Sequence, residues 1–391
     1  MDPFDAGDVI MVAESTTSGA STQSPLPRAL EQPLLMGLFL PLQSGAWNAS
    51  TLPRSTDWSF DFNLHCALEA ERLGFDLVFG LGQWMGKGGY GGAMRYREQA
   101  LDPLMATAGM VARTQRIPLI STVHILYGWH PVLLAKLAST LDHMSGGRWG
   151  INAVFGYKPR ELALFGMEEI SYEDRGPMVE EFVTIMERLW TEDEEFAFEG
   201  RHWSTQGAFL APKPRYGRPL MVNAGTSPAV IDYAARHSDI LFITSPGGSV
   251  PKNAYATLPA HTGSIKERAR QQGKDLKLLI HPMVICRETE KEAKAYAWAV
   301  LDHADPVVAQ AFTDSFLQGK QASWKATDYE STVLGGNVNL IGTPVQIVDH
   351  FLKLKQCGCD GIQVSFVGFE PDLAFFGEQV IPLMKEAGLR V

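Results

Sequence analysis

Residues 117–156 read IPLISTVHILYGWHPVLLAKLASTLDHMSGGRWGINAVFG, and the fold prediction depends on this stretch. The run from Ile117 is apolar and β-branched on both faces, which is typical of a buried strand. The segment PVLLAKLASTLDHMSGG then places apolar residues at i, i+3 and i+4, which predicts a helix. A second apolar run begins at Arg148. The stretch therefore predicts a strand, a helix and a second, parallel strand.

The same unit recurs along the chain. The other candidate strands are LMGLFLPL from Leu35, DLVFGLG from Asp76, PLMVNAG from Pro219, DILFITS from Asp239, LKLLIHPMVI from Leu276 and GIQVSFVG from Gly361. Segments of helical period lie between the strands, with stop signals at Gly74 and Gly358. Eight parallel strands covered by helices predict a (β/α)8 TIM barrel. The rival is a doubly wound open sheet, but residues 35–44 lack the GxGxxG motif that usually follows its first strand.

The chain divides into two parts of different composition. Residues 1–32 are rich in Ser, Thr, Pro and acidic residues, which predicts a mobile N-terminal extension, and residues 33–391 form a single barrel domain. We expect insertions after the fourth and seventh strands. The first, residues 156–219, contains FAFEGRHWSTQGAFLAP, which predicts a hairpin. The second, residues 288–361, contains the polar segment 305–336, a candidate lid.

Composition excludes several classes of protein. Lys and Arg number 34 against 44 Asp and Glu, and the net charge of -10 argues against nucleic-acid binding. No apolar run approaches the roughly 20 residues of a membrane helix, and no basic leader is present. The four cysteines lack zinc spacing and are expected to be free thiols. We therefore expect a soluble, cytoplasmic enzyme.

Catalytic residues of a barrel lie where its strands end. The predicted strand ends are Pro41–Gly45, Gly82–Trp84, Val123–Ile125, Asn152–Tyr157, Ala224–Ser227, Thr244–Gly247, Ile285–Cys286 and Phe366–Phe369. They include no His/Asp/Glu cluster with metal-ligand spacing, no carboxylate pair for hydrolysis and no GxSxG elbow. We therefore predict no metal site.

Small, amidic and aromatic residues remain at these ends. The turn 223–228, NAGTSP, opens a helix with the hydroxyls of Thr226 and Ser227, and it is either a phosphate site or a simple helix cap. His124 within an apolar strand is either a core histidine or a catalyst. The glycine-rich segment 86–92 lacks the ending of a P-loop and predicts a flexible active-site loop.

Several motifs resemble a known family. They are the block 128–156, the run YEDR from Tyr172, the NAGTS turn, GTPVQIVDHF from Gly342 and FEPDLAFFGEQVIPLMKEAG from Phe369. Together they resemble the bacterial luciferase-like flavin-dependent monooxygenases over all but the leading extension. The GWHP segment and the C-terminal run are most similar to the dimethylsulfone monooxygenase group. Asn152, Glu161 and Arg175 are similar to the pyrimidine monooxygenase group.

The resemblance implies a two-component barrel enzyme. Such an enzyme takes reduced FMN (FMNH2) from a separate NAD(P)H-dependent reductase and uses dioxygen to oxygenate and cleave a small organosulfur compound, a sulfone or sulfonate. Three alternatives stay open: ring opening of a pyrimidine or other N-heterocycle, a deazaflavin-dependent oxidoreductase, and a flavin-binding relative without catalysis. The family also implies a homo-oligomer.

Site residues carry over by motif. The implied cofactor-binding residues are Gly82, Gln83, Asn152, Glu161, Arg175, Gly176, Thr226 and Ser227. The expected catalytic residues are Asn152, His124 and Gln83, and the expected apolar wall is Trp84, Trp129, Tyr157 and Phe366. Where the pyrimidine group carries a threonine beside the flavin, counting back from Pro131 gives Val123, which argues against a pyrimidine-type oxygen pocket because valine donates no hydrogen bond.

Overall fold

The computed structural model describes residues 24–156, 158–225, 227–318 and 329–391. Eight parallel strands close a barrel in the order β1-β12-β9-β8-β7-β4-β3-β2. Their bounds are β1 Leu35–Leu40, β2 Leu77–Gly80, β3 Leu119–His124, β4 Trp149–Val154, β7 Leu220–Ala224, β8 Ile240–Ile243, β9 Lys277–Ile280 and β12 Gly361–Val364. The predicted (β/α)8 barrel is confirmed, and each predicted apolar run contributes one strand to it.

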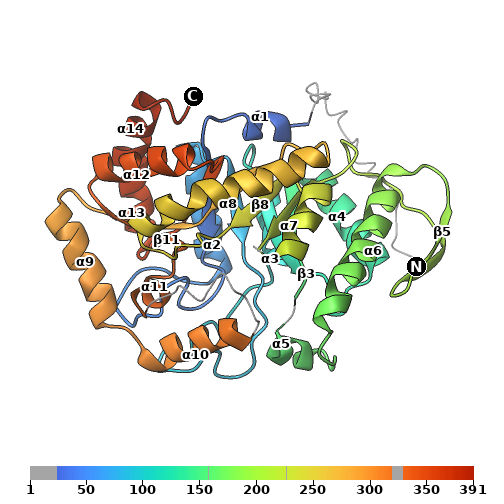
Figure 1. Ribbon diagram of the computed structural model, residues 1–391, viewed down its shortest axis with the longest axis horizontal. Helices are drawn as coiled ribbons and strands as arrows, with labels where there is room; N and C mark the ends of the chain where they lie inside the picture. The colour runs from blue at the N-terminus through green and yellow to red at the C-terminus, as the bar shows by residue number, and fades with distance from the viewer. Residues whose placement is uncertain (1–23, 157, 226, 319–328) are drawn as a thin grey trace, which may run out of the picture.

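Helices surround the barrel (Figure 1). They are α2 Phe60–Leu73, α3 Pro103–Val111, α4 Pro131–Ser145, α6 Tyr172–Thr191, α7 Pro228–His237, α8 Pro251–Gln271, α12 Pro344–Gln356, α13 Phe369–Phe375 and α14 Ile381–Glu386, with a π-helical turn at Phe376–Val380. The short helix α1 (Leu26–Leu30) falls within the predicted N-terminal extension, and its Leu26 is buried in the main core cluster. Residues 1–23 of that extension lie outside the described residues.

The register of β3 against β4 decides which side chains face the barrel interior. Thr122 pairs with Asn152 across the two strands, and their side chains share a hydrogen bond. Side chains alternate between the two faces of a strand. Accordingly Ser121 bonds to Thr107 of α3, and Val123 packs in the core between strands and helices. Thr122 and His124 therefore share the inner face.

The two long connections carry their own secondary structure. The first holds α5 (Pro159–Leu164), α6 and the predicted hairpin, confirmed as β5 (Phe196–Glu199) paired antiparallel with β6 (Ser204–Ala208). The second holds β10 (Pro282–Cys286), α9 (Glu290–Asp302), α10 (Pro306–Gln318), α11 (Tyr329–Leu334) and β11 (Val338–Gly342). Helices α10 and α11 belong to the segment predicted as a lid, whose residues 319–328 lie outside the described part of the chain.

One strand prediction is wrong in extent. The run LKLLIHPMVI breaks at His281: β9 stays in the barrel, whereas β10 leaves it and pairs with β11 in a separate parallel sheet. Periodicity could not locate this break because both halves are apolar and buried. The seventh barrel strand therefore ends at Ile280, and Ile285–Cys286 does not border the barrel mouth.

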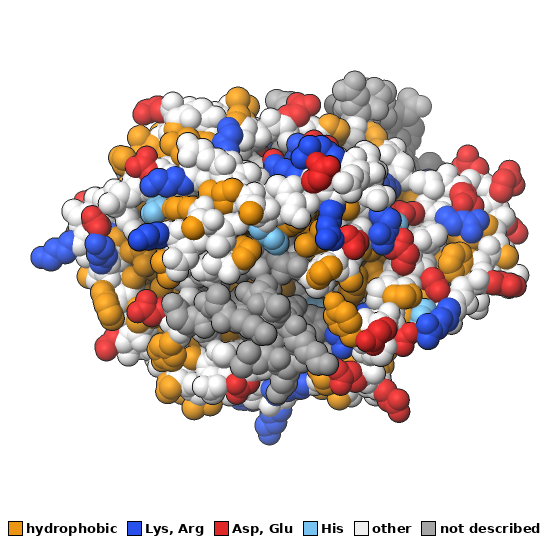
Figure 2. Space-filling view, in the orientation of Figure 1, with side chains coloured by type: hydrophobic (Ala, Val, Ile, Leu, Met, Phe, Trp, Pro, Cys, Tyr) orange, Lys and Arg blue, Asp and Glu red, His pale blue; other side chains and the backbone are white. Residues whose placement is uncertain are grey.

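On the face shown in Figure 2, basic and acidic side chains are interspersed, and neither gathers into a patch. All four cysteines are buried and free. Within the described ranges, no helix has the length and apolarity needed to cross a membrane. The same ranges contain no group of three His, Cys, Asp or Glu side chains suited to a metal ion.

Candidate active site

Asn152 lies at the inner face of β4, and only 1% of its surface is exposed. Its Nδ2 donates to Thr122 Oγ1 at 3.0 Å, while its Oδ1 is buried without a hydrogen-bond partner. Leaving such an atom unpaired costs about 1–3 kcal/mol. Asn152 Oδ1 is therefore an acceptor inside the barrel that is available to a hydrogen-bond donor of a bound molecule.

His124 ends β3 beside the loop that follows β2. A Cβ at Gly82 would lie 3.1 Å from the His124 ring, so glycine allows this close approach without displacing the ring. Tyr127 stacks on the other side, with ring centroids 4.9 Å apart. Burial lowers the pKa of His124 to about 4, although the charge of Glu161 opposes this shift. The imidazole is therefore neutral at physiological pH, and its Nδ1 is buried without a partner.

Glu161 of α5 joins the loops that follow three neighbouring strands. Its Oε1 accepts hydrogen bonds from Gln83 Nε2 at 2.9 Å and from Lys158 Nζ at 3.1 Å, and its Oε2 accepts one from the Tyr127 hydroxyl at 2.8 Å. Burial alone would raise the pKa of Glu161, but Lys158, His124 and these hydrogen bonds together lower it. The ionised carboxylate therefore fixes the loops after β2, β3 and β4 around His124.

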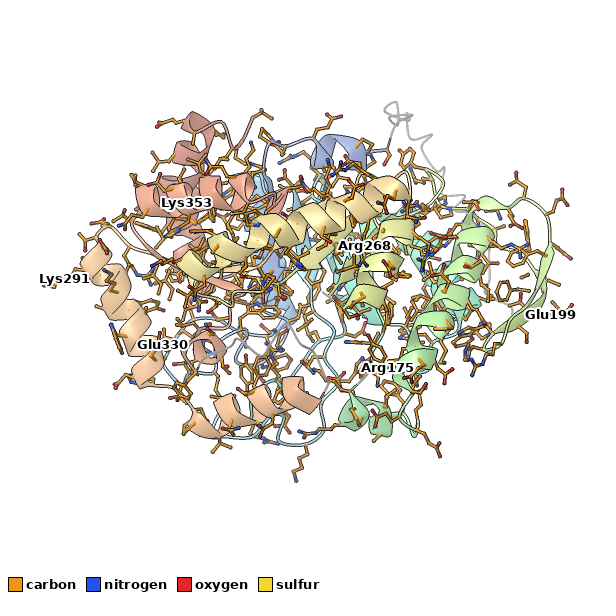
Figure 3. All side chains as sticks on the ribbon, viewed as in Figure 1. Arg175, Glu199, Arg268, Lys291, Glu330 and Lys353 are labelled. Carbon is orange, nitrogen blue, oxygen red and sulfur yellow. The ribbon has the colours of Figure 1, made fainter. Side chains whose placement is uncertain are left out.

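Two helix starts form a second part of the site. Arg175 lies in the first turn of α6, where Nε donates to the Ile170 carbonyl at 3.0 Å and Nη2 lies 3.5 Å from Glu169. Figure 3 shows it at the end of α6 that faces α5. Ser227 caps α7 and accepts from the backbone N–H of Val230 at 3.4 Å. A guanidinium and a helix N-terminus both favour an anion.

Comparisons with known proteins identify the family of this chain. A family model described as luciferase-like monooxygenase matches residues 36–361. The chain belongs to the luciferase-like monooxygenase family. An FMNH(2)-dependent dimethylsulfone monooxygenase of Pseudomonas fluorescens is 31% identical over 366 residues, which cover 91% of this chain and 96% of that protein. The pyrimidine monooxygenase RutA of Acinetobacter baylyi is 28% identical, covering 89% of this chain and 94% of its own.

Solved structures support the same fold. The crystal structure of riboflavin lyase with modified FMN and riboflavin superposes with a TM-score of 0.80 at 21% identity, covering 92% of this chain and 93% of that one. The predicted enzyme class, a flavin-dependent monooxygenase, is confirmed.

The predicted site residues of the enzyme fall into two described groups. One group is Gly82, Gln83, His124, Asn152 and Glu161, which β2, β3, β4 and α5 supply. The other is Arg175, Gly176 and Ser227 at the starts of α6 and α7, where a Cβ on Gly176 would meet no atom within 4 Å. Thr226 lies outside the described residues.

The predicted apolar wall is only partly assembled. Trp84 contacts Phe165, with ring centroids 5.1 Å apart, and Trp129 packs against the core that α4 and α6 share. Phe366 is instead fully buried against Phe369 and Phe376, and so belongs to the core rather than to a substrate wall. Tyr157 lies outside the described residues.

Sequence reasoning missed three residues. Thr122, not Val123, faces Asn152, so the count back from Pro131 selected the wrong face of β3. His281 directly follows the seventh barrel strand and bonds to Ser365 Oγ at 2.6 Å, while burial and the charge of Arg97 lower its pKa to about 3. Arg97 lies in the loop after β2, where no local pattern marks it. The break at His281 was detectable from Pro282, which cannot donate to a ladder.

Proposed function

We propose that the enzyme is a two-component monooxygenase that takes reduced FMN from a separate NAD(P)H-dependent reductase and oxygenates and cleaves a small sulfone or sulfonate. The relative from Pseudomonas fluorescens, which acts on dimethylsulfone with FMNH(2) according to its name, supports this assignment. The observation that carries it is the pair of unpartnered buried atoms, Asn152 Oδ1 and His124 Nδ1, on adjacent strands of the barrel.

The residues present suit a flavin. Asn152 and His124 can satisfy the polar edge of an isoalloxazine ring, which carries both hydrogen-bond donors and acceptors. Arg175 and Ser227 can hold the phosphate by charge-assisted hydrogen bonds. Gly176 leaves room for close approach, because a Cβ there would meet no atom within 4 Å.

When bound, reduced flavin supplies two electrons to dioxygen, so that one oxygen atom enters the substrate and the other leaves as water. The residues of the chain hold and shield this chemistry. Glu161 fixes the loops after β2, β3 and β4, and the burial of Asn152 and of the Nδ1 atom of His124 keeps bulk water away from these polar atoms. Because His124 is neutral, it can donate or accept one hydrogen bond without adding charge.

An anaerobic titration with reduced FMN tests the cofactor assignment. We expect saturable binding, followed on mixing with oxygen by product formation from dimethyl sulfone or methanesulfonate. NADH should support turnover only when a flavin reductase is added. Turnover with NADH alone contradicts the two-component mode, and a failure to bind reduced FMN contradicts the cofactor.

One observation favours a second candidate, the oxygenation of a pyrimidine ring. Thr122 places a hydroxyl beside Asn152, as expected of the pyrimidine group, and RutA is 28% identical to this chain. Uracil therefore belongs in the same substrate screen. Product from uracil, with none from either organosulfur compound, would replace the organosulfur proposal.

A further inference from the structure

Arg97 is a buried cation without a counterion among the described residues. Only 5% of its surface is exposed, and Nη1 donates a long hydrogen bond of 3.4 Å to Gln83 Oε1. Its Nε is buried without a partner, and no carboxylate of the described chain lies within ion-pair distance. Burial of an uncompensated charge is costly, so a group of this kind is retained where something else supplies the opposite charge.

Aromatic rings hold the guanidinium in place. Its central carbon lies 5.2 Å from the ring centroid of Trp47, 5.1 Å from that of Tyr96 and 4.8 Å from that of Phe312. These contacts attract a cation, but they do not neutralise it. The backbone of Arg97 has φ of 60°, in the left-handed region that is costly for a non-glycine residue. The fold thus sustains both strain and desolvation to place one positive charge.

A hydrogen bond connects Arg97 to the candidate active site. Gln83 joins it to the site, since the amide presents Oε1 to Arg97 and Nε2 to Glu161. Glu161 already pairs with Lys158, so it does not balance the charge of Arg97. On the other side, Trp47 contacts both Arg97 and His281, which is held neutral. Arg97 therefore brings a positive charge, unpaired among the described residues, next to apolar rings.

We propose that Arg97 binds the anionic head of the substrate, which makes the substrate a small sulfonate rather than a neutral sulfone. This inference rests on the proposed organosulfur oxygenation and selects between its two substrate classes. A sulfonate head offers three acceptor oxygens to the planar guanidinium, which forms strong, directional bonds to such groups. The alkyl part of the substrate would then contact the rings of Trp47 and Phe39, which lie 3.8 Å apart between centroids.

The flavin phosphate does not account for Arg97. Arg175 and Ser227 lie at the starts of α6 and α7, which follow β4 and β7, whereas Arg97 follows β2 and packs against α10. The two candidate anion sites are therefore built from different sectors of the barrel. A flavin phosphate at the helix starts leaves Arg97 for a second anion.

Methanesulfonate and dimethyl sulfone test the inference, because they have nearly the same shape and differ in charge. Their affinities for the full-length enzyme would be measured by isothermal titration calorimetry. We expect methanesulfonate to bind at least 10-fold more tightly. Arg97→Met should weaken methanesulfonate roughly 10- to 100-fold, the range of a charge-assisted hydrogen bond, and leave dimethyl sulfone within about 3-fold. Arg97→Lys should retain part of the affinity.

Arg95→Lys is the matched control. Arg95 lies in the same loop with φ of 45°, but its guanidinium is exposed and paired with Glu98. We expect this variant to bind methanesulfonate like the wild type. If Arg97→Met does not fold, the inference is tested by the wild-type affinities for methanesulfonate and dimethyl sulfone and by the affinities of Arg97→Lys. Equal wild-type affinity for the two compounds overturns the inference, as does an Arg97→Met variant that loses reduced FMN binding as strongly as methanesulfonate.

Turnover separates the inference from the proposed function. Arg97-dependent binding of methanesulfonate, without product from either compound when reductase, NADH and FMN are present, refutes organosulfur oxygenation but keeps the anion site. Efficient turnover of dimethyl sulfone that neither methanesulfonate nor Arg97→Met affects supports the function and refutes the anion site.

Discussion

At the scale of single residues, the site depends on individual hydrogen bonds and on shifted pKa values. Thr122 is the simplest case, because its Oγ1 accepts the one hydrogen bond that orients the Asn152 amide. We expect Thr122→Val, which keeps the shape, to free that amide and cost about 1 kcal/mol of stability. Less product should form per reduced flavin consumed, and Thr122→Ser should restore the ratio. Product yield against hydrogen peroxide release measures this effect.

The buried imidazole of His281 makes the free energy of unfolding depend on pH. Its folded pKa of about 3 lies below the usual value near 6.5, so the unfolded chain binds more protons between these limits. The contribution to stability is present above about pH 6.5 and is lost as the pH falls toward 3. Between pH 7 and pH 5, the wild type should lose roughly 2 kcal/mol more than His281→Gln. Urea unfolding at both values checks this, with the surface variant His303→Gln expected to follow the wild type.

Among the elements, α6 and α7 carry the proposed phosphate site, because Arg175 and Ser227 lie at their starts. Arg175→Met and Ser227→Ala should each weaken reduced FMN about 10-fold and reduced riboflavin little, since riboflavin lacks the phosphate. Anaerobic fluorescence titration with both flavins measures the difference. Thr343→Ala removes a comparable cap from α12 and should leave both affinities unchanged. An equal loss for FMN and riboflavin would contradict the phosphate assignment.

The elements also explain what the sequence could predict. Barrel strands are apolar on both faces and helices have a 3.6-residue period, so all eight units were recognisable. Register is a different matter: a shift of one residue exchanges the faces of a strand, which is how Val123 was chosen in place of Thr122. Arg97 was out of reach, because its importance arises from Trp47 and Phe312, which are distant in sequence.

At the scale of the whole molecule, one end of the barrel carries the candidate site and the other end contributes to stability. The end opposite the site is closed by Arg390, which pairs with both carboxylate oxygens of buried Asp76 and donates to the carbonyls of Leu34 and Gly74. In Figure 1 the C-terminus accordingly lies near α1 and α14, away from α5 and α10. Residues at this end of a barrel support stability rather than chemistry.

Removal of one partner at this end should therefore be structural in effect. Arg390→Met leaves the Asp76 carboxylate buried and unpaired, and we expect a loss of about 3–5 kcal/mol in the free energy of unfolding. The double variant Asp76→Asn with Arg390→Met should recover part of that loss. Denaturant unfolding measures both, and the KM of the folded variants should match the wild type. A changed KM would mean that the two ends are coupled.

The small sheet of β10 and β11 has a consequence for the long segment that follows β9. Because these strands pair in parallel, the chain that leaves the barrel after β9 and the chain that returns toward α12 run side by side, roughly 4.8 Å apart. The segment between β10 and β11 therefore begins and ends at one pair of hydrogen-bonded strands. Because neither strand belongs to the barrel sheet, a segment exchanged between them would leave the strand pairs of the barrel unchanged.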